Sequence, residues 1–121
     1  ELIVGAVNDP HFGPYVMVGL GGVLTEVLHD VSHRFAPVTA ATAQDMLAEL
    51  KGAKILDGYR GAPPVDTDAI ADVLVRLSWL INDHRGQIAE IDINPLFARA
   101  KGKGVVAADA LVVLRESQKV S

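Results

Sequence analysis

The sequence predicts an α+β domain in which helices pack against one face of a largely antiparallel sheet. Two valine-rich runs, residues 2–7 and 15–20, open the chain with strand patterns, two helical patterns follow, and strand patterns return near the end. Half of the 121 residues are hydrophobic, which is enough for one domain with a buried core. We expect the other face of the sheet to be polar and open.

The composition excludes several classes of protein. A net charge of −4 without a long basic run argues against binding to nucleic acid or to an anionic membrane surface. The absence of cysteine excludes a disulfide scaffold, a thiolate zinc site and a cysteine nucleophile, and it fits the reducing cytoplasm, where we expect the protein to act. No apolar stretch reaches the roughly 18 residues of a membrane span. Because the sequence opens without methionine directly on a strand pattern, we expect a fragment of a longer protein.

The first two strands are expected to form a hairpin, because residues 8–14 between them are dense in turn formers. After Gly19, Gly21 and Gly22, the pattern of residues 23–30 predicts a third strand. Glycines at such a position permit either a plain turn or a close approach of the backbone to a phosphate. They match no complete phosphate-loop motif, so both interpretations stay open at this point.

Two helices are predicted from apolar stripes that follow helix caps. Thr39 is a suitable N-cap for a helix that runs to Leu50, and Asp66 caps a longer helix, to about Asn82, that should cover the sheet. Between these helices, Arg60 lies in a linker-like passage, next to a glycine. This arginine could bind a phosphate or carboxylate bidentately, or it could form an ordinary surface salt bridge.

The chemistry is expected on a strand at residues 88–94. Side chains alternate along a strand, so Glu90, Asp92 and Asn94 point to one face, and we call these three residues the polar ridge. Their oxygen atoms are the ligand type that magnesium prefers. A solvated sheet face is the structural alternative for the same pattern.

A returning strand is predicted at residues 105–113, after a polar turn that contains glycine. If the turn is centred on Lys101 and Gly102, paired residues have numbers that add to 203, and Asn94 faces Asp109. Directly opposed residues have Cβ atoms about 4.5–5.5 Å apart, and magnesium binds oxygen at about 2.0–2.1 Å, so one ion could sit between them. A register shift of one residue would send Asp109 to the other face.

The order of four short motifs along the chain indicates a family. The motifs are Val-Gly-Ala-Val-Asn-Asp-Pro-His-Phe-Gly-Pro at 4–14, Gly-Leu-Gly-Gly-Val at 19–23, Asp-Gly-Tyr-Arg-Gly at 57–61 and Glu-Ile-Asp-Ile-Asn-Pro-Leu at 90–96. Together they resemble the ATP-grasp domain of ADP-forming acyl-CoA synthetases, with acetate–CoA ligase as the nearest type. The likeness runs from residue 1 to about residue 113 and corresponds to the second ATP-grasp subdomain. We therefore expect one subdomain at residues 1–114 and a polar tail at 115–121.

The resemblance implies roles for individual residues. In the related succinyl-CoA synthetase β subunits, an asparagine and an aspartate on the next strand hold the magnesium of the nucleotide, and these correspond to Asn94 and Asp109. Asp92 corresponds to a family acidic residue near the phosphorylated histidine and is the expected catalytic residue, although those β subunits carry glutamate there. The residues expected to contact the nucleotide are Gly21, Gly22 and Arg60.

The implied reaction makes acyl-CoA from a carboxylate, CoA and ATP, through an acyl phosphate and a phosphohistidine. The expected cofactors are Mg²⁺ and ATP or ADP, and the expected partner is the CoA-binding or phosphohistidine domain or subunit of the same enzyme. No phosphohistidine motif surrounds any of the four histidines, and the first ATP-grasp subdomain would precede Glu1, so the chain alone should not turn over. The alternative is a non-catalytic sensor or interaction module fused to a lysine acetyltransferase. A homo-oligomer is compatible with both.

Overall fold

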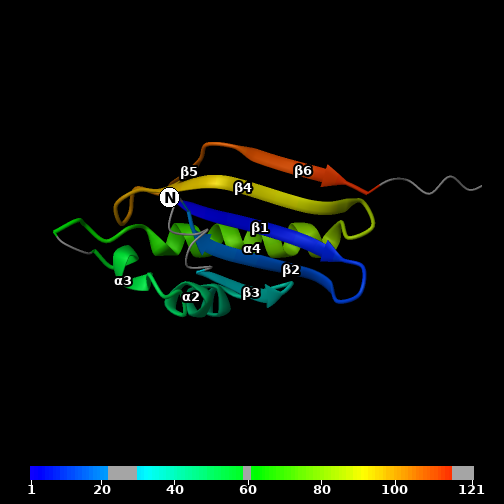
Figure 1. Ribbon diagram of the computed structural model, residues 1–121, viewed down its shortest axis with the longest axis horizontal. Coiled ribbons are helices and arrows are strands. Elements are labelled where there is room, and N and C mark those ends of the chain that lie inside the picture. Colours follow the sequence, from blue (N-terminus) through cyan, green and yellow to red (C-terminus); the bar gives the residue numbers. More distant parts are fainter. Residues whose placement is uncertain (22–29, 59–60, 116–121) are drawn as a thin grey trace, which may run out of the picture.

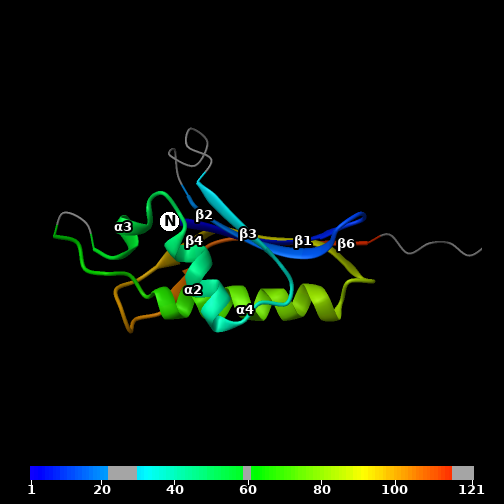
Figure 2. The same ribbon diagram turned by 90° about the horizontal axis from the view of Figure 1, so that it is seen from below.

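The described elements form one six-stranded antiparallel sheet with helices on one side (Figure 1). The computed structural model describes residues 1–21, 30–58 and 61–115. The strand order is β3-β2-β1-β4-β5, and β6 pairs with β4 beside β5. Figure 2 shows that α2 and α4 lie on the same side of the sheet. The predicted α+β class, with helices on one face and the other face open, is confirmed.

The predicted N-terminal hairpin is formed by β1 (Leu2–Asp9) and β2 (Gly13–Leu20), which pair along their whole length. The side chain of Asp9 closes the turn, because one of its oxygens accepts hydrogen bonds from the backbone N–H groups of His11 (2.7 Å) and Phe12 (3.0 Å). These two bonds hold the pKa of Asp9 below its usual value. The turn residues therefore close the hairpin that was predicted from the sequence.

The third strand, β3 (Val31–Phe35), pairs antiparallel with β2. It begins just after the stretch 23–30 that was predicted as a strand, and of that stretch only Asp30 belongs to the described residues. Asp30 is buried, with 4% of its surface exposed. Its two carboxylate oxygens accept hydrogen bonds from the backbone N–H groups of Lys51 (2.6 Å) and Gly52 (2.7 Å). The start of β3 is thereby tied to the segment that follows α2.

The helices begin where their caps predict. Helix α2 (Ala40–Ala48) is capped by the Thr39 side chain, and α4 (Thr67–Asp83) by Asp66, which accepts a hydrogen bond from the N–H of Ala69 (3.1 Å). A short helix, α3 (Ala53–Leu56), overlaps the start of the passage at residues 55–64 that was predicted to be linker-like. None of the described helices combines the length and apolar character that a membrane span requires.

The hydrophobic core lies between the sheet and the helices. Helix α4 contacts β1, β2 and β4, and α2 packs against α4 and β3. The inner face of the sheet and the apolar stripe of α4 therefore remove each other from water, as the helical periodicity predicted. Fully buried side chains from the two layers include Leu2, Val4, Val16, Val18, Met46, Ile70, Leu74, Ile81 and Leu96.

An ion pair joins β3 to the end of α2 and makes stability sensitive to acid. The Arg34 guanidinium binds both oxygens of Glu49 (2.8 and 2.7 Å), and the Ser32 hydroxyl also donates to Glu49. Arg34 first, and then Ser32, lowers the pKa of Glu49 from 4.5 to about 2. A lowered folded-state pKa stabilises the protein above the unfolded value of 4.5, and this contribution is lost as the pH falls from 4.5 towards 2.

We therefore expect Glu49→Gln to flatten the dependence of the melting temperature on pH between 4.5 and 2. The effect should be small, because the pair is partly exposed and screened by solvent. Thermal melts followed by circular dichroism at several pH values would measure it. A parallel shift of the whole profile, with the same slope as the wild type, would contradict the assignment.

Candidate functional site

The polar ridge lies on the central part of β4 (Ile88–Ala98), as the alternation of side chains predicted. Ile91 faces the helices and is 3% exposed, whereas Glu90 and Asn94 are exposed and Asp92 is half-buried. Strand β4 runs between β1 on one side and β5 and β6 on the other. Because Ile91 faces the helices, the ridge lies on the other, open face of the sheet. Figure 2 shows α2 and α4 together on one side of the sheet.

Strand β4 continues beyond residue 94, where the predicted strand ended, and a bulge accommodates Pro95 within it. Val4 pairs with Ile93 and Leu2 with Leu96, so β4 carries one more residue than β1 between these two pairs. The extra residue falls at Asn94 or Pro95. Proline has no backbone N–H to give to a ladder, and bulges tolerate this loss. The bulge thus determines the backbone conformation of β4 at Asn94, the last residue of the polar ridge.

The predicted hairpin register is confirmed on both sides of the bulge. Strand β5 (Val105–Ala107) pairs Ala107 with Leu96, and β6 (Ala110–Leu114) pairs Leu111 with Asp92, so both pairs have numbers that add to 203. The turn is closed by a hydrogen bond from the N–H of Lys103 to the carbonyl of Ala100 (2.8 Å), and Gly102 has a φ of 82°. Only glycine adopts this conformation readily.

The returning segment is two strands, β5 and β6, where one strand at 105–113 was predicted. Residues Ala108 and Asp109 interrupt it directly opposite the bulge at Asn94 and Pro95. The ladder still holds across the gap, because Ala108 donates to the carbonyl of Pro95 (3.0 Å) and Asn94 donates to the carbonyl of Asp109 (3.1 Å). The break lies opposite Pro95, which has no N–H to donate, and opposite the bulge that β4 forms against β1, and side-chain alternation alone did not predict it.

Asn94 and Asp109 face each other across this bridge, as predicted. Both residues are exposed. The two ion pairs among the described residues are Arg34–Glu49 and Arg76–Asp72, so neither occupies the carboxylate of Asp109 or Asp92. Opposed side chains at such a position have Cβ atoms about 4.5–5.5 Å apart. In this register the pair would offer one amide oxygen and one carboxylate to the open face, and the role of both residues as metal ligands stays a prediction.

This donor set fits magnesium held mainly by other ligands. No group of three or more histidine, aspartate or glutamate side chains suited to a metal occurs in the part of the chain that the structure describes. A site with one or two protein oxygens is typical of Mg²⁺, which keeps several waters and takes further ligands from substrate phosphates. The described residues therefore do not form a site in which protein side chains supply all the metal ligands.

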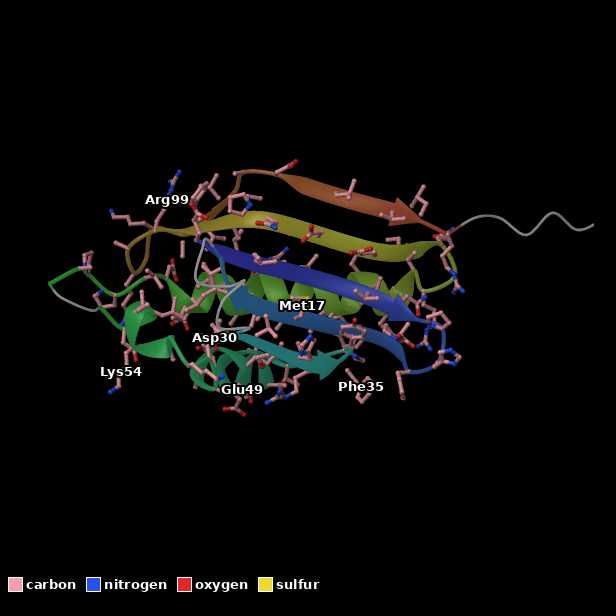
Figure 3. All side chains as sticks on the ribbon, in the orientation of Figure 1. Met17, Asp30, Phe35, Glu49, Lys54 and Arg99 are labelled. Atoms are coloured by element: carbon pink, nitrogen blue, oxygen red, sulfur yellow. The ribbon has the colours of Figure 1, made fainter. Side chains whose placement is uncertain are left out.

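The turn next to the site is held by the cap of α4. One oxygen of Asp66 caps the helix, and the other accepts the N–H of Gly104 (2.8 Å), while the Asp66 N–H donates to the carbonyl of Arg99 (2.8 Å). The bond from Gly104, followed by that from Ala69, lowers the pKa of Asp66. Figure 3 shows Arg99 at this end of the molecule. The predicted helix cap therefore also positions the β4–β5 connection.

Gly5 is a site residue that sequence analysis missed. It pairs with Asp92 on β4 and with Met17 on β2, so it lies on the open face beside the ridge. A Cβ added at Gly5 would lie 3.2 Å from the carbonyl oxygen of Ile91 and 3.4 Å from Cγ of Met17. Gly5 itself is buried, and the absence of a side chain leaves room for Met17 and for the β4 backbone next to Asp92. A glycine inside a strand was the available signal for such a close approach.

The three residues predicted to bind nucleotide are described only in part. Gly22 and Arg60 lie outside the described residues. The N–H of Gly21 donates to the carbonyl of Glu1 (2.8 Å), and a Cβ at Gly21 would come within 3.1 Å of Glu1. The close contact with Glu1 is sufficient to explain why position 21 is a glycine. The binding of nucleotide by Gly21 stays a prediction.

Comparison with known proteins identifies the family. Residues 1–114 match a family model described as an ATP-grasp domain, and the chain belongs to this family. It is 44% identical over 115 residues to acetate–CoA ligase [ADP-forming] II subunit beta of Pyrococcus furiosus, covering 95% of this chain and 49% of the relative. It is 50% identical over 116 residues to acetate–CoA ligase [ADP-forming] I of Archaeoglobus fulgidus, covering 96% of this chain and 16% of that relative.

Solved structures share the fold. The crystal structure of PH1788 from Pyrococcus horikoshii Ot3 superposes with a TM-score of 0.91 at 41% identity, covering 97% of this chain and 49% of that chain. An acetyl-coenzyme A synthetase 1 of Ca. Korarchaeum cryptofilum, in complex with coenzyme A and Mg-AMPPCP, gives a TM-score of 0.86 at 47% identity, with 95% of this chain and 53% of that chain covered. The present chain spans about half the length of the Pyrococcus β subunit it matches.

Proposed function

We propose that this chain supplies the metal–nucleotide part of the ATP-grasp domain in an ADP-forming acyl-CoA synthetase of the acetate–CoA ligase type. The observation that carries the proposal is the opposition of Asn94 and Asp109 on the open face of the sheet, through the hydrogen bond from the Asn94 N–H to the Asp109 carbonyl (3.1 Å). The relatives support the reaction class, since they are named as ADP-forming acetate–CoA ligases. They favour this function over the sensor-module alternative.

In this proposal Asn94 and Asp109 hold Mg²⁺, which bridges the phosphates of ATP or ADP. The ion neutralises phosphate charge and aligns the groups for in-line transfer. The protein contributes two oxygen ligands. Asp92 lies two residues before Asn94 on the same face, with Gly5 beside it, and would face the phosphohistidine.

The proposed partner is the CoA-binding or phosphohistidine domain or subunit of the same enzyme. The Korarchaeum structure with coenzyme A and Mg-AMPPCP has its phosphohistidine segment pointing towards the nucleotide-binding site. In the present chain, the corresponding approach is the open face that carries the polar ridge. On this face Asp92 lies between Gly5 on β1 and the exposed Leu111 on β6, so a segment bearing the phosphohistidine would reach the Asp92 carboxylate next to an apolar side chain.

A chimeric ligase would test the proposal. This chain would replace the matching half of Pyrococcus furiosus acetate–CoA ligase II subunit beta, assembled with the rest of that enzyme. We expect formation of acetyl-CoA and ADP that requires acetate, CoA, Mg²⁺ and ATP, at a rate within about tenfold of the parent, because the fold and the metal pair are kept. A subunit lacking the segment serves as the inactive control. A well-folded chimera without ATP-dependent synthesis would contradict the proposed function.

A further inference from the structure

Asp66 contacts both strands of the hairpin that carries the proposed metal pair, Asn94 and Asp109. Its carboxylate accepts the N–H of Gly104 (2.8 Å), where the returning strand begins, and its own N–H donates to the carbonyl of Arg99 (2.8 Å), where β4 ends. Arg99 and Gly104 are themselves paired, because the N–H of Arg99 donates to the carbonyl of Gly104 (3.0 Å). Both pairs have numbers that add to 203, so Asp66 binds the hairpin in the register that opposes the metal pair.

Burial holds the register of the returning strand only weakly. A strand with one buried face cannot shift by one residue without exposing its apolar side chains to water. In β5 only Val105 is half-buried, and all five residues of β6 are exposed, with exposed fractions of 59% for Leu111 and 67% for Leu114. A shift by one residue would therefore lose little burial, yet it would turn Asp109 to the other face of the sheet.

The turn between the two strands also holds the register weakly. Lys101 and Gly102 occupy its central positions, and Gly102 has a φ of 82°. With lysine before the glycine, this angle fits a type II turn, since the alternative type I′ would need a positive φ at Lys101 as well. The twist of a type II turn does not match that of the strands, so such a turn splays a hairpin. Contacts from outside the hairpin are therefore needed to keep the two strands in register.

The segment at residues 64–66, just before α4, supplies such contacts. It lies beside the end of β4, where the N–H of Lys101 donates to the carbonyl of Pro64 (2.9 Å) and Val65 forms an isolated bridge with Ala100. These contacts hold only the β4 side of the turn. The returning strand therefore depends on a separate contact.

The Asp66 carboxylate provides the contact to the returning strand. Of the hydrogen bonds that residues 64–66 make within the described part of the chain, only the one from the Gly104 N–H involves that strand. Asp66 is buried, with 8% of its surface exposed, and its other oxygen accepts the N–H of Ala69 (3.1 Å) in the first turn of α4. Because α4 packs against the sheet, the carboxylate is held in place from the core side.

We propose that Asp66 is a positioning residue for the metal pair, because its carboxylate fixes the register that sets Asp109 opposite Asn94. The inference rests on the proposed function only in assigning that pair to Mg²⁺. The register is a property of the single chain, and it can be measured without activity. Gly104 precedes Asp109 by five residues and Arg99 follows Asn94 by five, so the pair that Asp66 binds and the metal pair belong to one ladder.

Asp66→Ser separates the two contacts of the carboxylate. Serine is a good N-cap, so this variant should keep the hydrogen bond to α4, but a single short hydroxyl cannot also reach the N–H of Gly104. Asp66→Asn, which keeps one acceptor oxygen, is a second variant if serine prevents folding. The control is Thr39→Ala, which removes the cap of α2 and so weakens a helix without touching the hairpin.

Hydrogen exchange of the single chain, followed by NMR, is the first measurement. The N–H groups of Asn94 and Ala108 report on the hairpin, because they donate to carbonyls on the opposite strand. We expect Asp66→Ser to raise their exchange rates at least about tenfold relative to the amides of β2, and Thr39→Ala to leave that ratio unchanged. Rates in Asp66→Ser equal to those of the wild type would overturn the proposal, since the contacts of Arg115 at the other end of the strand would then suffice.

The Mg²⁺ dependence of the chimeric ligase is the second measurement, and it tests the link to the metal pair. Asp66→Ser should raise the Mg²⁺ concentration for half-maximal rate at least about fivefold, because a misplaced ligand binds metal less well. Thr39→Ala should leave it unchanged, since a loss of helix stability alone does not alter the site. Faster exchange in Asp66→Ser with an unchanged Mg²⁺ dependence would overturn the positioning role. A chimera that is inactive with Asp66 intact would contradict the proposed function instead, and the exchange rates would still decide the register.

Discussion

Replacing Asp109 with alanine in the chimeric ligase is expected to lower the rate of ATP-dependent acetyl-CoA synthesis by at least about 100-fold. The carboxylate is the charged member of the proposed metal pair, and its loss leaves Mg²⁺ with a single neutral ligand from this chain. Asn94→Ala should have a similar effect, because it removes the opposing oxygen. Initial rates over a range of Mg²⁺ concentrations would measure both, and Asp109→Asn should raise the Mg²⁺ concentration needed for half-maximal rate.

The matched control is Asp83→Ala, which removes an exposed carboxylate at the end of α4, in the layer opposite the site. It should leave the rate and the Mg²⁺ dependence unchanged. Near-normal turnover in both Asp109→Ala and Asn94→Ala would refute the assignment of the metal pair. Circular dichroism of each variant separates loss of chemistry from loss of fold, and little unfolding is expected because both residues are exposed.

Asp30→Ala is expected to cost about 3 kcal/mol of the free energy of unfolding. Its carboxylate is buried and accepts the N–H groups of Lys51 and Gly52, so removing it leaves two backbone donors without their partner. An unsatisfied buried donor costs about 1–3 kcal/mol. Figure 3 shows Asp30 on the β3 and α2 side of the molecule, away from β6. Urea denaturation followed by circular dichroism would give the difference.

Two variants make the Asp30 measurement specific. Asp30→Asn keeps the shape and one acceptor oxygen, so it should recover part of the lost stability. Asp45→Ala removes an exposed carboxylate on α2 and should change stability by less than about 0.5 kcal/mol. If Asp30→Ala were no more destabilising than Asp45→Ala, the hydrogen bonds from Lys51 and Gly52 to Asp30 would not contribute measurably to stability.

Local patterns were sufficient to predict most of the fold. Turn residues between two valine-rich runs predicted the first hairpin, caps at Thr39 and Asp66 predicted both main helices, and alternation placed the polar ridge on the open face. These predictions succeed because a turn, a cap or an alternating pattern involves residues close in sequence. The third strand shows the limit, because β3 begins at Val31 and its start is tied by Asp30 to a segment some twenty residues later.

The same local reasoning also predicted the opposition of Asn94 and Asp109, the proposed metal ligands. Counting from the turn at Lys101 and Gly102 placed Asn94 opposite Asp109, and the backbone bridge between them has that register. Three other features depend on pairing with β1: the bulge at Pro95, the division of the returning segment into β5 and β6, and the close packing at Gly5. Pairing with β1 is a long-range contact that no local pattern encodes.

The sequence by itself determined the class of fold, the hairpin register and which face carries the acidic residues, because these follow from side-chain alternation and turn chemistry along neighbouring residues. Only the tertiary structure decided that Asp66 holds the β4–β5 turn as well as α4, that Asp30 anchors β3, and that β6 is left as an apolar edge. These features depend on which elements meet in space. Burial and free strand edges are properties of the whole arrangement, and a valine pattern reads the same in a central strand and at an exposed edge.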